Sequence, residues 1–133
     1  MLVMILDKDK RSGELIETMF LEMGGWELKT LVLETWLNLP LHLCTFRPSL
    51  VVIKMDEAAE LALLTIDAYR KQVNFSIRVV IIAEKPVVRE QYAAAESIIA
   101  GQSLANPRDF ARRMRTELQS ARISAQAAAT YCL

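Results

Sequence analysis

The chain has 133 residues, 53% of them hydrophobic and 24% charged, and its 16 basic side chains balance 16 acidic ones. This length predicts a single domain with a sizeable core, and the apolar fraction together with the zero net charge excludes intrinsic disorder. The two cysteines are too few to hold a small secreted scaffold together, and the balanced charge argues against nucleic acid as the main partner.

The balance of charge hides a difference between the two halves of the chain. Residues 1–60 contain 6 Lys/Arg and 10 Asp/Glu, whereas residues 61–133 contain 10 and 6, so the halves carry net charges of −4 and +4. The opening apolar run ends at Leu6, which is too early for a signal peptide, and no run approaches the roughly 18 residues of a membrane span. We therefore expect a cytoplasmic protein that does not enter a membrane and whose cysteines are reduced thiols.

The chain begins with a strand pattern followed by a helix pattern. Leu2 to Leu6 is a continuous apolar run, which predicts a strand buried on both faces of a parallel sheet. Apolar side chains then recur at helical spacing from Leu15 to Met23, and Gly24-Gly25 predicts the end of that helix. A partly alternating run near Trp26 to Val32 predicts a second strand that lies nearer an edge of the sheet.

The same alternation continues through the middle of the chain. A short or kinked helix is expected over about Thr35 to Cys44, because Pro40 interrupts it. Leu50 to Ile53 is a second continuous apolar run and predicts a buried strand, and a helix is expected from about Glu57 to Gln72. The apolar stripe of that helix is formed by Leu61, Leu64 and Ala68.

Two more strands and a short helix are expected before residue 106. Val79 to Ala83 predicts a buried strand, and the alanine-rich stretch from about Val88 to Ala95 predicts a short helix. The fifth strand is either Ser97 to Ala100 or Gln102 to Ala105, and the pattern alone does not decide between them.

The last helix begins just after Asn106-Pro107, where the missing proline N–H does no harm, and continues to at least Leu118. This alternation of strands and helices predicts an α/β fold, a doubly wound five-stranded parallel sheet with helices on both faces. In such folds the chemistry lies at the carboxyl ends of the strands. The candidate site segments are therefore Asp7-Lys8-Asp9, Lys54-Met55-Asp56, Ala83-Glu84-Lys85 and the loop up to Asn106-Pro107.

Four segments, in this order and at this spacing, resemble the receiver domain of two-component response regulators, typified by the chemotaxis regulator. The segments are Leu2 to Asp9, Arg47 to Met55, Arg78 to Glu84 and Leu104 to Phe110. The resemblance implies the (βα)5 flavodoxin-like receiver fold. It covers essentially residues 1–118 and leaves residues 119–133 as a helical extension or tail.

The resemblance also identifies a phosphorylation site whose residues have changed. The family uses an aspartate as phosphoryl acceptor, two acids that hold Mg²⁺, a hydroxyl and a lysine. This chain has Lys54 at the acceptor, Lys8 at the second acid, Ala83 at the hydroxyl and Asn106 at the lysine, and only Asp7 is kept. Because Mg²⁺ needs oxygen ligands and two ammonium groups repel it, we expect no metal, no cofactor, no enzymatic activity and no phosphorylation by the usual route.

The changed residues suggest how the site is filled. Asp7 is costly to leave unpaired at a strand end, so we expect Lys54 to pair with it, and with Asp9 or Asp56 in addition. The alternative is a solvated Lys54 without a defined partner. A cation site built from Asp7, Asp9, Asp56 and Glu57 is disfavoured by the two lysines beside it.

The last helix carries a row of basic side chains. Arg108, Arg112, Arg115 and Arg122 fall on one stripe, which lies beside an apolar stripe that we expect to face the sheet. The resemblance implies that this helix and its neighbours form the surface for dimerisation and partner docking. An acidic protein partner, or the acidic half of a second copy, suits the arginines, and the alternative is a solvated helix face.

The sequence therefore predicts a degenerate, phosphorylation-independent receiver that acts as a protein–protein interaction module in bacterial two-component-type signal transduction. One alternative is the amino-terminal regulatory domain of a larger transcription regulator. Another is a small-ligand sensor or enzyme that reuses the strand-end pocket around Asp7, Lys54 and Ala83. His42 lies near Cys44, but without a third positioned group the pair does not indicate a catalytic site.

Overall fold

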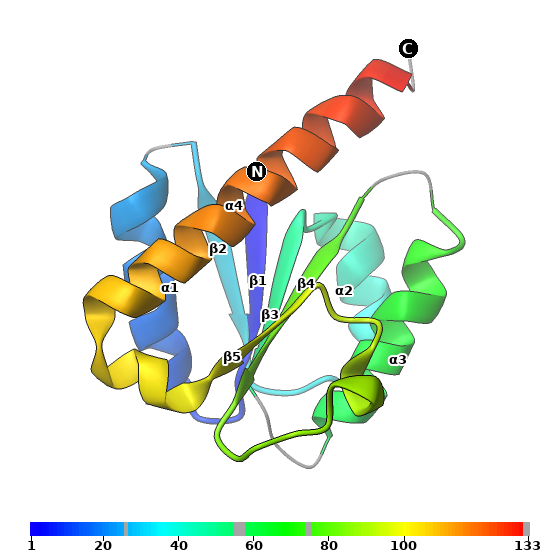
Figure 1. The fold of residues 1–133 in the computed structure, drawn as a ribbon. Helices are drawn as coiled ribbons and strands as arrows, with labels where there is room; N and C mark the ends of the chain where they lie inside the picture. Colours follow the sequence, from blue (N-terminus) through cyan, green and yellow to red (C-terminus); the bar gives the residue numbers. More distant parts are fainter. Residues whose placement is uncertain (26, 55–57, 74–75, 132–133) are drawn as a thin grey trace.

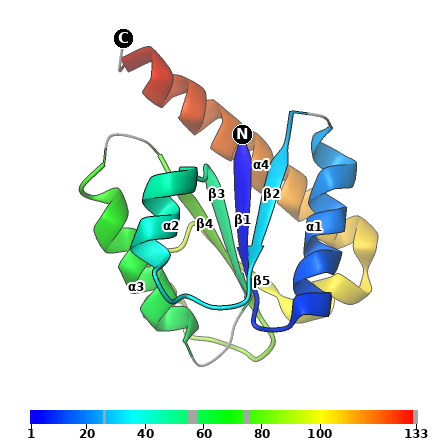
Figure 2. The same cartoon turned by 180° about the vertical axis from the view of Figure 1, so that it is seen from behind.

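The computed structural model describes residues 1–25, 27–54, 58–73 and 76–131, with the side chains of residues 24, 102–103 and 125–131 left aside. It has one parallel sheet between two layers of helices (Figures 1 and 2). The strands are β1 (Leu2–Leu6), β2 (Lys29–Leu33), β3 (Leu50–Lys54), β4 (Arg78–Ala83) and β5 (Ser97–Ala100). Their order, β2-β1-β3-β4-β5, places β2 and β5 at the edges and confirms the predicted five-stranded, doubly wound sheet.

Four α-helices and two 3₁₀ helices accompany the strands in the described part of the chain. They are α1 (Lys10–Gly24), α2 (Leu39–Phe46), α3 (Ala59–Arg70), η1 (Arg89–Tyr92), η2 (Gly101–Ala105) and α4 (Pro107–Tyr131). Ile16 of α1 and Phe110 of α4 belong to one apolar cluster on one face of the sheet. Leu43 of α2 and Ile66 of α3 belong to a second cluster on the other face. Among the described residues, no helix is long and apolar enough to cross a membrane.

The first helix has clear sequence signals at both ends. Asp9 precedes it with extended backbone, and its carboxylate accepts hydrogen bonds from the backbone N–H groups of Arg11 and Ser12 at 3.0 and 3.5 Å. Gly25 follows the helix at a φ of 70°, a left-handed conformation that favours glycine. The predicted end of the helix at Gly24-Gly25 is therefore confirmed.

The second helix differs from its prediction. It begins at Leu39, later than the expected Thr35, so Pro40 lies in the first turn and does not interrupt it. A proline there removes an N–H that has no partner within the helix in any case. The helix is short, as expected, and it ends at Phe46.

The third helix buries a different face from the one predicted. Leu61 and Leu64 are 65% and 58% exposed, and the buried residues are Ala59, Ala62, Leu63 and Ile66. Both faces of this helix are apolar, so helical spacing alone does not identify the inner one. On the buried face two small alanines accompany two large side chains, which lets the helix come close to its neighbours.

The helix predicted over Val88 to Ala95 is absent, and this segment contains only the 3₁₀ helix η1. Arginine side chains hold this segment in its irregular path. Arg89 donates to the carbonyl groups of Tyr92 and Ala95, and Arg70 of α3 donates to that of Ala94. The fifth strand is Ser97–Ala100, which decides the alternative that the sequence left open.

The last helix continues without a break from Pro107 to Tyr131, and Figure 1 shows its end projecting beyond the sheet. The predicted apolar stripe is buried as far as Ala121, three residues past the expected domain limit at Leu118. The division into residues 1–118 and 119–133 stays a prediction.

Arg70 connects α3 to the segment before β5. Its guanidinium contacts Asp67 at 2.9 Å and Glu96 at 2.8 Å, and it donates to the Ile77 carbonyl at 3.1 Å. We expect Arg70→Ala to lower the free energy of unfolding by about 2–3 kcal/mol, because the carboxylate and carbonyl groups lose their donor. The control is Lys71→Ala, which removes a 74% exposed partner of Asp67 and should cost about 0.5 kcal/mol or less. Urea unfolding measures both, and equal losses would contradict the prediction.

Candidate functional site

The site is built around Asp7, which follows β1 and is only 2% exposed. Its backbone N–H donates to the carbonyl of Leu33 at 3.0 Å, which fixes it between β1 and β2. One carboxylate oxygen, Oδ1, accepts a hydrogen bond from the backbone N–H of Asp9 at 2.9 Å. The other, Oδ2, is buried and accepts no hydrogen bond from any described residue. This oxygen therefore depends on a nearby positive charge.

Lys54 supplies that charge from the neighbouring strand β3. Its Nζ lies 3.9 Å from Oδ2 of Asp7 and 3.3 Å from Oε1 of Glu84, and it donates a hydrogen bond to Oγ of Ser12 at 2.6 Å. The side chain is 15% exposed. The predicted ion pair between Lys54 and Asp7 is thus confirmed, and the solvated alternative is wrong.

The other partners of Lys54 differ from those expected. Asp9 is not one of them, because its carboxylate caps α1, and Asp56 lies outside the described residues. Glu84 and Ser12 take part although the sequence analysis did not select them for this role. Glu84 directly follows β4, and the rule that parallel strands meet at their carboxyl ends could have identified it. No sequence pattern identifies Ser12 as a site residue, since the packing of α1 against the sheet brings it to Lys54.

Gly13 lets α1 approach the site closely. A Cβ atom at this position would lie 2.8 Å from Cγ1 of Val32 and 3.4 Å from Cβ of Asp7. The first distance is too short for two carbon atoms, so only glycine fits without a shift of β2 or of the helix. The close approach of α1 contributes to the burial of the Asp7 carboxylate.

The other predicted site residues take no part in the ion pair between Asp7 and Lys54. Ala83 is buried at the end of β4 and has no group that could bind a phosphoryl oxygen. Lys8 is exposed. Asn106 is also exposed, and its Oδ1 accepts a hydrogen bond from the Asp109 N–H at 3.4 Å at the start of α4. The structure therefore brings Asp7 and Lys54 together, and Asn106 acts at a helix terminus.

These residues do not fit a magnesium site. The described residues contain no group of three or more His, Cys, Asp or Glu side chains placed to hold a metal ion. The ammonium of Lys54 already lies beside the buried oxygen of Asp7 and would repel a second cation. Lys54 occupies the last position of β3, where the resemblance places the acceptor aspartate, and Asp56 lies outside the described residues.

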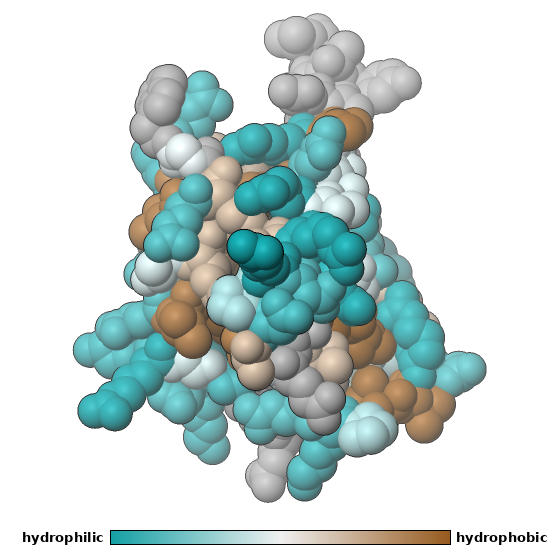
Figure 3. Space-filling view, turned by 60° about the vertical axis from the view of Figure 1, so that its left-hand side comes forward, coloured by the Kyte–Doolittle hydropathy of each residue, from teal (hydrophilic) through white to brown (hydrophobic). Residues whose placement is uncertain are grey.

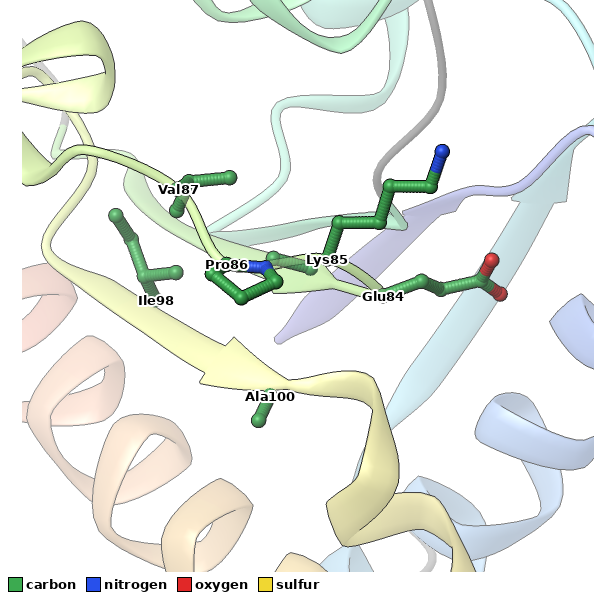
Figure 4. A pocket seen from close by; sticks show the side chains of 7 residues that line it. Glu84, Lys85, Pro86, Val87, Ile98 and Ala100 are labelled. Carbon is green, nitrogen blue, oxygen red and sulfur yellow. The ribbon is translucent and has the colours of Figure 1, made fainter.

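A hollow of about 340 Å³ lies next to the site, at the ends of β4 and β5. In Figure 4, Pro86, Val87 and Ile98 gather around it, whereas the Glu84 and Lys85 side chains extend away. Neither Asp7 nor Lys54 lines it. A ligand pocket was expected around Asp7, Lys54 and Ala83, and only Ala83 lines this hollow. The Lys54 ammonium contacts Asp7 instead of facing the hollow.

The arginines predicted on the last helix are all exposed on α4. Arg112 contacts Asp109 at 2.6 Å, and Arg113, which the prediction omitted, contacts the same aspartate at 3.4 Å. Figure 3 brings the first half of α4 forward and shows hydrophilic side chains over the middle of this face. One aspartate shared by two arginines leaves the surface with an excess of positive charge.

No protein-family model matches the sequence, and no curated protein sequence matches it significantly. Solved structures do match. An orphan response regulator of H. pylori is 18% identical, with a TM-score of 0.67 over 91% of this chain and 95% of that one. A chemotaxis protein of Vibrio cholerae is 10% identical, with a TM-score of 0.67 over 86% and 96%.

A third match is an atypical orphan response regulator whose structure revealed a phosphorylation-independent regulatory mechanism. It is 21% identical, with a TM-score of 0.59 over 77% of this chain and 82% of that one. Together these structures show that the chain has the fold of response-regulator receiver domains, as the sequence predicts.

The Lys54 ion pair makes a testable contribution to stability. We expect Lys54→Met to lower the free energy of unfolding by about 2–4 kcal/mol at neutral pH, because it leaves the Asp7 carboxylate buried without a cation. Chemical unfolding at neutral pH measures this, and a loss below about 1 kcal/mol, the usual value for an exposed ion pair, would contradict it.

Two further variants serve as controls for this ion pair. Asp7→Asn added to Lys54→Met removes the uncompensated charge and should recover part of the lost stability at neutral pH. Glu84→Gln removes the other carboxylate that contacts Lys54, but this side chain is 62% exposed. Its loss should therefore stay within about 1 kcal/mol.

Proposed function

We propose that this protein is a phosphorylation-independent receiver domain that acts through protein–protein contacts in bacterial two-component-type signal transduction. The observation that carries the proposal is the position of Lys54. Its ammonium group lies where β1, β3 and β4 end, in contact with Asp7 and Glu84. The chain thus provides its own cation at the place where the resemblance puts metal-assisted phosphoryl chemistry.

The ion pair also ties several elements together. Asp7 follows β1, Glu84 follows β4 and Ser12 belongs to α1, so the ammonium group at the end of β3 contacts three other segments. A domain in which this contact is permanent has no chemical switch of its own. Its state is then set by a partner that binds one conformation better than another.

Two of the matched structures support this proposal. Both are orphan response regulators, and the regulatory mechanism of one is described as phosphorylation-independent. In our proposal the present chain belongs to the same functional class, in the cytoplasm and without enzymatic activity. Neither Asp7 nor Lys54 lines the strand-end hollow, so no observation favours the ligand-sensor alternative.

The proposed contact surface is α4 with its neighbours. Arg108, Arg112, Arg115 and Arg122 are exposed along this helix and attract an acidic surface. That surface belongs to another protein or to the acidic residues 1–60 of a second copy. Nucleic acid fits less well, because the chain as a whole has no basic surplus.

Chemical phosphorylation tests the proposed function directly. We expect acetyl phosphate with Mg²⁺ to leave the mass of the intact protein unchanged, because an ammonium group stands at the acceptor position and repels the metal. A receiver domain that keeps its acceptor aspartate, treated in parallel, should gain one phosphoryl group. Incorporation at any aspartate of this chain would overturn the proposal.

A further inference from the structure

The edge strand β5 has backbone groups that point away from the sheet. β4 is its hydrogen-bonded neighbour on one side, and its other side is open to the viewer in Figure 1. Val79 of β4 faces β5, because its carbonyl accepts a hydrogen bond from the backbone N–H of Glu96. Backbone direction alternates along β4, so Ile81 faces β5 as well, and in a parallel pair it bonds to the residues on either side of its register partner Ile98. Ser97 and Ile99 therefore face β4, and Ile98 and Ala100 present their N–H and C=O groups at the open edge.

The open edge is bordered on both sides. In Figure 1, α4 lies on one side of β5 and the segment of residues 84–96 lies on the other. This segment has no α-helix, and it follows an irregular path held by Arg70 and Arg89. A strand added beside β5 would therefore place its side chains alternately toward α4 and toward the 84–96 segment.

The two borders offer hollows of different chemistry. The hollow beside the 84–96 segment is apolar at its centre, where Pro86, Val87 and Ile98 gather (Figure 4). A second hollow, of about 240 Å³, lies on the α4 side, where Arg113, Thr116 and Glu117 form its polar wall. Ile98 lines both hollows, so they meet at the edge strand.

The hollow on the α4 side is suited to a negative charge. Glu117 contacts Nη2 of Arg78 at 3.0 Å and accepts a hydrogen bond from Ser97 Oγ, so its charge is compensated. Arg113 is 49% exposed and shares Asp109 with a second arginine, so positive charge is left over. A carboxylate entering this hollow meets a guanidinium that is only partly neutralised.

We propose that the open edge of β5 binds an extended segment of a partner protein in which apolar and acidic residues alternate. The main-chain groups of Ile98 and Ala100 pair with the segment, its apolar side chains enter the hollow at Val87, and its carboxylates reach Arg113. This inference rests on the proposed function, because it names the partner chemistry of the same contact surface.

Pairing with β5 of a second copy does not fit this edge. Pairing two β5 strands would bring two α4 helices together, and their exposed arginines, Arg112, Arg113 and Arg115 among them, would repel one another. The β5 sequence, Ser-Ile-Ile-Ala, also supplies no carboxylate for Arg113. The arginines thus disfavour self-pairing through an exposed edge and admit an acidic segment.

The test uses a short fluorescent peptide in which valine and glutamate alternate. We expect saturable binding to the whole chain in the micromolar range by fluorescence anisotropy. A peptide of the same composition, with its valines in one block and its glutamates in another, keeps the charge and loses the alternation. Equal binding of the two peptides, or no binding of the alternating peptide up to about 1 mM, would overturn the proposal.

N-methylation of the peptide tests strand addition without changing the protein. Methyl groups on the amides of either the glutamates or the valines block one edge of the extended peptide. If the peptide pairs with β5, one methylated form should bind about tenfold or more weakly and the other should bind normally. Loss with the valine set indicates antiparallel pairing, and loss with the glutamate set indicates parallel pairing. Equal effects of the two sets would refute strand addition.

A matched pair of charge reversals tests the α4 side. Arg113→Glu should weaken binding of the alternating peptide by about fivefold or more, whereas Arg115→Glu, on the same helix but outside the hollow, should weaken it less. Equal weakening would mean attraction by the helix as a whole and would contradict the proposed site. If the peptide experiments fail and acetyl phosphate transfers no phosphoryl group to the chain, only this inference is rejected. Phosphorylation of the chain would reject the proposed function.

Discussion

The strand-end site depends on one interaction between a buried carboxylate and a lysine. Asp7 is 2% exposed and has an oxygen that accepts no hydrogen bond from the described residues, so the fold needs a positive charge within a few ångströms of it. Lys54 provides that charge at 3.9 Å. The same ammonium group binds Glu84 and Ser12, so the requirement of one carboxylate fixes the relative positions of three strand ends and the first helix.

The fold could be predicted from the sequence because its strands are short apolar runs. Their alternation with helix patterns specified the doubly wound sheet and placed the Lys54 and Asp7 side chains at the same end of it. The face of α3 was mispredicted, because Leu61 and Leu64 form as good a stripe as the residues that are buried. The missing helix before β5 could not be foreseen, since part of what holds this segment in place is Arg70, a residue distant in sequence.

The partners of Lys54 could likewise be predicted only in part from the sequence. The pair with Asp7 follows from two strands that are neighbours in the sheet, and it needed only the topology. The contact with Ser12 depends on how closely α1 approaches β1, which Gly13 allows and which no local pattern reports. Asp9 was expected beside Lys54 but caps α1, because a helix beginning at the next residue offers it N–H groups at shorter range.

The outward face of α3 has a consequence for the behaviour of the protein in solution. Leu61 and Leu64 are more than half exposed, and Leu41 on the adjoining helix α2 is 64% exposed. The chain has no net charge at pH 7 and an isoelectric point of about 6.6, so little long-range repulsion keeps molecules apart at neutral pH. The exposed leucines and the balanced charge together favour association of the folded protein as the pH approaches the isoelectric point.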